Sequence, residues 1–159
     1  MSTPDIRAAA PEDLDDLAGL NAQVQALHVR LQPSRFRADP APSELRAHLR
    51  DVLARSDHRI WVGCADGRAR GYIWFELQER APTPYVQALR RLYVHHICVD
   101  ASARRQGVAR ALMRRVEAEA ATRSMSEIAL DVWSANREAL AFFQSTGYAA
   151  SRVVLAKAL

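Results

Sequence analysis

The sequence predicts an α+β fold in which helices pack on both sides of a mixed, mostly antiparallel central sheet, on three observations. Apolar residues recur at three- and four-residue spacing over several stretches, as on one face of a helix. Short runs rich in β-branched and aromatic residues alternate with these stretches. In the second half, a strand, a helix and a strand follow one another with short connections, which is typical of two parallel strands joined by a crossover helix.

The beginning of the chain predicts one strand and two helices. Residues 5–10 form the opening strand, and a helix begins at Pro11, because proline suits a first turn and the following acids favour the positive end of the helix dipole. A loop with three prolines over 32–42 separates it from a second helix beginning at Ser43. The two apolar stripes are Leu14, Leu17, Leu20, Val24 and Leu27, and then Leu45, Leu49, Val52 and Leu53.

A hairpin follows these helices. The runs 59–65 and 71–78 are β-rich, and Asp66-Gly67 between them is a hairpin turn signal. A proline-containing loop covers 80–91. The three tryptophans fall in predicted strands and are predicted as core residues: Trp61, Trp74 and Trp133.

The second half predicts a βαβ unit followed by a helix and a closing strand. The unit consists of a strand over 92–99, a helix over 106–122 and a strand over 127–133. Asn136 or Ser134 caps the next helix, over 136–146, and Gly147 ends it. Residues 148–157 are predicted to form the closing strand.

Length and composition indicate one soluble globular domain over residues 1–159. The chain is 49% hydrophobic and 25% charged, and a chain of this size buries roughly 70% of the surface that its unfolded form exposes. Its two cysteines, Cys64 and Cys98, form no Cys-x-x-Cys pair, which excludes a disulfide scaffold or a zinc ribbon and indicates no metal. The first residues lack the pattern of a signal peptide, and no apolar run is long enough to span a membrane, so a cytoplasmic location is expected.

The net charge of +4 is concentrated in one short window. Residues 1–100 carry 13 basic and 13 acidic side chains, and residues 124–159 carry three of each, so both segments are neutral. Residues 101–123 carry six arginines and two glutamates, which accounts for the whole excess. A nucleic-acid surface usually spreads its basic residues along a face. RNA binding is therefore kept as the weakest alternative, and the prediction is a protein without a nucleic-acid partner.

The arginine window begins at the junction between strand 92–99 and its following helix. The start of a helix leaves about four backbone N–H groups without internal partners, and the helix dipole adds about half a positive charge there. Gly107 and Ala109 have little side chain, so a phosphate can approach these amides, and Arg104, Arg105 and Arg110 supply the countercharge. Neither a P-loop nor a dinucleotide fingerprint is present. The alternative is a solvated, arginine-rich helix start.

Two spaced motifs resemble those of the GNAT superfamily of N-acetyltransferases. Arg104-x-x-Gly107-x-Ala109 after a strand is similar to the family's acyl-CoA pyrophosphate loop, Arg/Gln-x-x-Gly-x-Gly/Ala. The stretch LDVWSANREALAFFQSTGY (130–148) resembles its second cofactor segment, through Asn136, Ala139, Phe142-Phe143, Gly147 and Tyr148. The resemblance is strong over 92–148 and topological over 1–80.

The resemblance implies a GNAT-type sheet whose parallel βαβ strands splay apart around acetyl-CoA, the cosubstrate, with no metal. Backbone groups of Ile97, Cys98 and Val99 hold the acetyl and pantetheine part. Asn136 and Phe142 line the pantetheine arm. The pyrophosphate lies on the amides of Arg105, Gln106, Gly107, Val108, Ala109 and Arg110, beside Arg104.

The reaction that the resemblance implies is direct attack of a primary amine, on a small molecule or peptide, on the thioester. An alkylammonium must first lose a proton, which at pH 7 costs roughly 4–5 kcal/mol, so a general base is expected. His95 is the preferred base; His96 beside it and a water-only reaction remain alternatives. Adjacent strand residues point to opposite faces, so only one of the pair is expected to serve, unless a bulge resets the strand. Covalent catalysis by Cys98 is disfavoured, since a mid-strand cysteine is usually a buried apolar residue.

The general acid is unassigned, because Phe143 stands where many relatives have a tyrosine. Tyr93 or Tyr85 is an alternative donor, the thiolate can leave unaided, or the protein is a catalytically lapsed CoA-binding sensor or adaptor. The acceptor pocket is expected from residues 20–42 and the 80–91 loop, with Tyr85, His28 and Phe36 as its lining. A homodimer and the absence of a membrane partner are further expectations.

Overall fold

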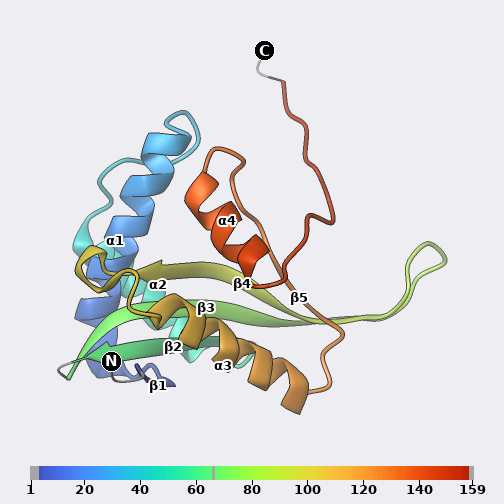
Figure 1. The fold of residues 1–159 in the computed structure, drawn as a ribbon, viewed down its shortest axis with the longest axis horizontal. Coiled ribbons are helices and arrows are strands. Elements are labelled where there is room, and N and C mark those ends of the chain that lie inside the picture. Colours follow the sequence, from blue (N-terminus) through green and yellow to red (C-terminus); the bar gives the residue numbers. More distant parts are fainter. Residues whose placement is uncertain (1–3, 66, 158–159) are drawn as a thin grey trace.

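The computed structural model describes residues 4–65 and 67–157, so the predicted turn residue Asp66 lies outside the described part. Within these ranges, five strands form one sheet in the order β1-β2-β3-β4-β5 (Figure 1). They are β1 (Asp5–Ala8), β2 (His58–Ala65), β3 (Arg68–Arg80), β4 (Leu89–Val99) and β5 (Glu127–Leu130). The first four pair antiparallel with their neighbours, and β4 and β5 pair parallel. The predicted mixed, mostly antiparallel sheet is therefore confirmed.

Helices cover both faces of this sheet. They are α1 (Leu14–Leu31), α2 (Pro42–Ala54), α3 (Val108–Thr122) and α4 (Arg137–Ser145), with short 3-10 turns at Pro11–Asp13 and Ala101–Ala103. No helix in the described ranges has the length and hydrophobicity needed to cross a lipid bilayer.

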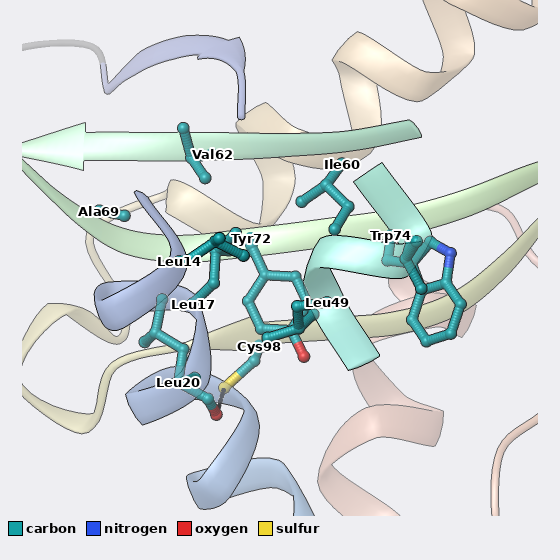
Figure 2. Close-up of a cluster of buried hydrophobic side chains, with 12 residues drawn as sticks. Leu14, Leu17, Leu20, Leu49, Ile60, Val62, Ala69, Tyr72, Trp74 and Cys98 are labelled. Atoms are coloured by element: carbon teal, nitrogen blue, oxygen red, sulfur yellow. Dashed lines mark hydrogen bonds between the residues drawn. The ribbon is translucent and has the colours of Figure 1, made fainter. Parts of the chain in front are cut away.

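The stripes of α1 and α2 pack on one face of the sheet. Leu17 and Leu49 are fully buried against Tyr72 and Ile60, in the cluster that Figure 2 shows. Trp74 belongs to the same cluster at 8% exposure, which confirms its predicted core position. Burying a large apolar side chain stabilises the fold by about 1.5–3 kcal/mol. This cluster therefore fixes α1 and α2 on the sheet.

The other face carries α3, whose stripe packs on Ile73, Phe75 and Leu92. The first turn of α3 approaches the sheet closely, because strand glycines make room for it. A Cβ added to Gly63 would lie 2.9 Å from Val108 Cγ1, and one added to Gly71 would lie 3.0 Å from the same atom. These glycines thus set the position at which α3 begins.

The parallel pair β4–β5 separates partway along. Its last pair is Val94 with Leu130, and β4 continues for five residues, 95–99. Residues 96–99 pair with β3 on one side, and no described residue pairs with residues 95–99 on the side that β5 has left. The predicted splay between the two strands is therefore present, although β5 ends at Leu130 and not at residue 133.

The predicted closing strand over 148–157 is wrong for the described chain. This segment belongs to no strand, and it extends away from the body after Gly147, whose φ of +94° ends α4 (Figure 1). Val153, Val154 and Leu155 are 78%, 75% and 91% exposed. β propensity expresses itself through packing on neighbouring strands, and this segment has no neighbouring strand among the described residues.

Candidate active site at the strand separation

The edge of β4 left by β5 carries the predicted acetyl and pantetheine residues Ile97, Cys98 and Val99. The Cys98 side chain points away from this edge into the α1 cluster, where its S–H donates to the carbonyl oxygen of Leu20 at 3.2 Å (Figure 2). Burial raises the pKa of the Cys98 thiol to about 11. The thiol therefore stays protonated at neutral pH, which argues against covalent catalysis.

The β4–α3 connection exposes backbone amides. Arg105 and Gly107 have φ of +61° and +82°, and left-handed residues in a turn are typical of backbone concavities that bind anions. The N–H of Ala111 donates to the Gly107 carbonyl at 2.9 Å, so the amides of residues 108–110 precede this helical hydrogen bond. No described atom lies within 4 Å of a Cβ built on Gly107. The loop thus has open space directly above its glycine.

Positive charge surrounds this loop. The predicted countercharges Arg104, Arg105 and Arg110 are all exposed, and none makes an ion pair with another described residue. The acid at the start of the loop, Asp100, accepts hydrogen bonds from Ser102 and from the Gln23 side chain at 3.0 Å, which lower its pKa to about 2. Its charge is stabilised locally, and the arginines stay available to an anion.

The remaining predicted cofactor residues lie on α4, which follows β5 and so belongs to the other side of the separation. Asn136 caps this helix: its Oδ1 accepts from the Ala139 N–H at 3.2 Å, which confirms Asn136 over Ser134 as the cap. Phe142 is half-buried and meets Phe143 edge-on, with ring centres 5.2 Å apart.

A bulge in β4 places both histidines on the same face of the sheet. Trp74 pairs with His96 and Phe75 with Val94, so His95 is the extra residue. Both rings contact Trp74: His95 stacks on the indole at 4.6 Å and His96 meets it edge-on at 5.3 Å. The alternation to opposite faces therefore does not hold here, and the alternative that a bulge resets the strand is confirmed.

The two histidines differ in their partners. His96 Nδ1 lies 3.2 Å from both the Tyr72 hydroxyl and Asn21 Nδ2, and burial lowers the pKa of His96 to about 4. His95 Nε2 instead lies 2.9 Å from Glu76 Oε2. The low pKa makes His96 a weak proton acceptor, whereas His95 has a carboxylate partner that orients it, so His95 is the better candidate base.

A carboxylate–histidine group beside His95 has the composition of a metal site. Atoms of Asp57, His58 and Glu76 lie within 4.8 Å of one another. However, the Trp74 indole N–H donates to His58 Nδ1 at 2.8 Å, so the proton of the neutral imidazole is on Nε2. That nitrogen has no lone pair for a metal ion, and the geometry favours a proton donor over a ligand.

Aromatic side chains from both sides of the opening meet above His96. His28, at the end of α1, stacks on Phe36 at 4.8 Å and lies 6.1 Å from the His96 ring. Phe36 meets Trp133 edge-on at 5.6 Å. The prediction of Trp133 as a strand residue of the core is wrong, because β5 ends at Leu130 and Trp133 is half-buried in the following loop. His28 and Phe36 thus form one aromatic group with His96 and Trp133.

The 80–91 loop does not join this group. Residues 81–88 form the tip of the long β3–β4 hairpin, which projects away from α1 and α4 (Figure 1). Tyr85 is 94% exposed there. Its predicted place in the acceptor pocket is wrong, because β3 and β4 stay paired as far as Arg80 and Leu89 and carry the loop outward.

Position 143 has a phenylalanine and therefore no hydroxyl group that could act as the general acid. Phe143 is 6% exposed in the α3 cluster. Tyr93 donates its hydroxyl proton to Asp131 Oδ2 at 2.6 Å, and burial together with this bond raises the pKa of Tyr93 to about 12. Tyr148, which burial also holds protonated with a pKa of about 12, has a buried hydroxyl without a described partner.

Together, these features define a class of protein. Its members have an open mixed sheet, and here the one described parallel pair of strands separates next to an exposed, arginine-rich helix start. The sequence model of the acetyltransferase (GNAT) family matches residues 24–148. The chain therefore belongs to the GNAT family, and the resemblance inferred from the two motifs is confirmed.

Similar proteins agree with this assignment. Over 59 residues, 37% of this chain, the sequence is 41% identical to human N-acetyltransferase 8, of which the match spans 26%. A mutant form of the BH1408 protein from Bacillus halodurans has a TM-score of 0.89 at 24% identity, covering 98% of this chain and 99% of that one. The aminoglycoside N-acetyltransferase AAC(6')-Iy, solved with the bisubstrate analogue CoA-S-monomethyl-acetylneamine, has a TM-score of 0.73 at 21% identity, covering 99% of each chain. At these identities the likeness to solved structures shows the fold.

Sequence reasoning missed three residues around His95. Glu76 and Trp74 lie on β3, and His58 begins β2. A signal was present, since Glu76 is a carboxylate within the otherwise apolar run GYIWFELQ. Its partner is 19 positions away in sequence, and only strand pairing brings the two together.

Proposed function

We propose that this chain, acting as a single domain over residues 1–159, transfers an acetyl group from acetyl-CoA to a primary amine of a small molecule or peptide. The observation that carries the proposal is the unpaired edge of β4 leading directly to the open amides at Gly107, within the range that the family model matches. The two free cysteines suit a reducing compartment such as the cytoplasm.

Three features of the chain fit acetyl-CoA, whose thioester supplies the activated acetyl group. The backbone edge at residues 97–99 offers hydrogen bonds to an extended amide-containing arm. The amides of residues 105–110 and the free arginines suit a pyrophosphate, since each charge-assisted hydrogen bond contributes about 1.5–3 kcal/mol. Asn136 and Phe142 would line the arm from the α4 side. A solved relative contains a CoA analogue, which supports the same cosubstrate here.

His95 is the group that would take the proton from the amine. It lies in the bulge immediately before the free edge, and its Nε2 is already engaged by Glu76, which leaves Nδ1 for the acceptor or a bridging water. The aromatic residues His28, Phe36 and Trp133 would border the entering amine. Burial lowers the pKa of His28, so this side chain is uncharged at neutral pH.

Phe143 favours a second candidate function, a sensor or adaptor that binds CoA without transferring acetyl groups. The side chain is buried and carries no proton for the departing thiolate. For an acetyltransferase, the thiolate would leave unaided or be protonated by the charged base or the new ammonium. Binding of acetyl-CoA without thiol release from any amine would support the sensor.

Calorimetric titration with acetyl-CoA, followed by a thiol-release screen, tests the proposal. The screen covers simple amines, aminoglycosides and peptides with free N-termini. We expect saturable binding and amine-dependent thiol release with at least one class. An absence of binding at millimolar acetyl-CoA would contradict both functions.

A homodimer is also proposed, and the C-terminal segment supports it. Three consecutive aliphatic side chains, Val153, Val154 and Leu155, are exposed, and β5 forms the edge of the described sheet. An extended segment of one copy can add a strand to a free sheet edge of another and bury these side chains.

Val154→Asp is therefore expected to convert a dimer into a monomer, because it places a charge in the buried strand of the interface. Light scattering coupled to size exclusion measures the mass. Val86→Asp is the matched control: Val86 is 61% exposed on the distant hairpin tip, and its variant should stay dimeric. A monomeric wild-type protein, or a dimeric Val154→Asp variant, would contradict this assembly.

A further inference from the structure

We propose that Glu76 is a positioning residue that holds the His95 imidazole in one tautomer and keeps its Nδ1 free to accept a proton. The inference rests on the proposed function, in which His95 accepts the amine's proton. It concerns how a carboxylate on the neighbouring strand makes that histidine effective.

The first step is the tautomer of His95. Glu76 Oε2 lies 2.9 Å from His95 Nε2, and it also accepts from Gln78 Nε2 at 3.0 Å. Burial alone would raise the pKa of Glu76, but the hydrogen bonds from Gln78 and His95 lower it overall, so Glu76 is ionised at neutral pH. An ionised carboxylate only accepts, so Nε2 must donate, and Nδ1 keeps the lone pair.

The second step is the fixed orientation of the ring. His95 stacks on Trp74 at 4.6 Å and lies 5.5 Å from the nearly parallel His58 ring. Tyr93 meets it edge-on at 5.0 Å. Trp74 is itself held by the bond from its indole N–H to His58 Nδ1. These contacts limit rotation, so the Glu76 bond decides which nitrogen faces the reaction.

The third step is the charge around the ring. On the β2 side, His58 has its pKa lowered by burial and is neutral, while Asp57 is paired with Arg55. On β4, His96 is neutral and Tyr93 stays protonated, with Arg91 over the face of its ring and Asp131 on its hydroxyl. From α2, His48 contacts Trp74. Among the described carboxylates, Glu76 is the one bonded to His95, so the acceptor that fixes the proton on Nε2 comes from this residue.

Glu76→Gln and Glu76→Ala separate charge from orientation. Gln keeps an acceptor oxygen for His95 Nε2 but removes the charge, so Glu76→Gln should retain more of the wild-type kcat than Glu76→Ala. Ala removes both, and kcat should fall by about 10- to 100-fold with little change in the KM for acetyl-CoA. Glu79→Gln is the matched control, because Glu79 lies on the same strand but pairs with Arg90.

Nitrogen-detected NMR of the imidazoles provides a readout independent of turnover. We expect neutral His95 to carry its proton on Nε2 in the wild type, and to populate both tautomers in Glu76→Ala. A proton on Nδ1 in the wild type, or an unchanged Nε2 tautomer in Glu76→Ala, would overturn the inference. Failure of the wild type to release thiol with any amine would instead contradict the proposed function, and the NMR result would still decide the pairing.

Discussion

Gly107→Asp is expected to weaken acetyl-CoA binding by at least about 100-fold, as the loss of two or more charge-assisted hydrogen bonds implies. The variant places a carboxylate in the open space above the Gly107 amide, where no described atom lies within 4 Å. The new negative charge would repel the pyrophosphate, and the new side chain would keep it from the amides of the loop. Calorimetric titration measures the affinity.

Gly67→Asp is the matched control for this variant. Gly67 has a φ of +74°, close to the +82° of Gly107, and likewise has no described atom within 4 Å of an added Cβ. Each variant therefore carries the same charge change and a similar backbone strain, of about 1–3 kcal/mol. Gly67→Asp should bind acetyl-CoA like the wild type, with a similar loss of thermal stability. Wild-type affinity in Gly107→Asp would remove the pyrophosphate from this loop.

His95→Ala is expected to lower kcat/KM for the amine by about 100-fold or more at neutral pH, which is the usual effect of removing a general base. The affinity for acetyl-CoA should be nearly unchanged, because the predicted cofactor contacts lie further along β4 and in the loop. The residual rate should increase with pH as the free amine becomes available. Steady-state kinetics across pH, with binding measured separately, tests both statements.

His48→Ala is the comparison for this loss. His48 is an exposed histidine on α2 whose ring meets Trp74 edge-on at 5.6 Å, so its removal shows what the loss of an imidazole beside the site does when β4 itself is unchanged. Its variant should lose much less of kcat/KM than His95→Ala. An unchanged profile in His95→Ala would remove His95 from its role, and a loss confined to His96→Ala would transfer that role to His96.

Most elements of the fold could be predicted because their signals are local. The stripe at Leu14, Leu17 and Leu20 identifies α1, since residues three and four apart share a helix face. The prediction failed for residues 148–157, where an apolar, β-branched run has no neighbouring strand among the described residues. Strand composition shows that a segment can pair, but the partner is decided elsewhere in the chain.

The candidate site divides in the same way. The loop from Arg104 to Arg110 could be predicted, because the helix start, its glycine and its arginines are contiguous. The surroundings of His95 could not, because Glu76 and His58 reach it only through the register of three strands. Tyr85 was misplaced for a related reason: the sequence does not show how far the hairpin extends before its loop.

The amino-acid order alone determined the helix stripes, the strand–loop–helix junction and the two motifs of the GNAT family, because each depends on residues close to one another in the chain. Only the tertiary structure decided which face His95 and His96 share, which carboxylate bonds to His95, and that the final segment leaves the sheet. These features depend on cross-strand register, which one extra residue in β4 shifts.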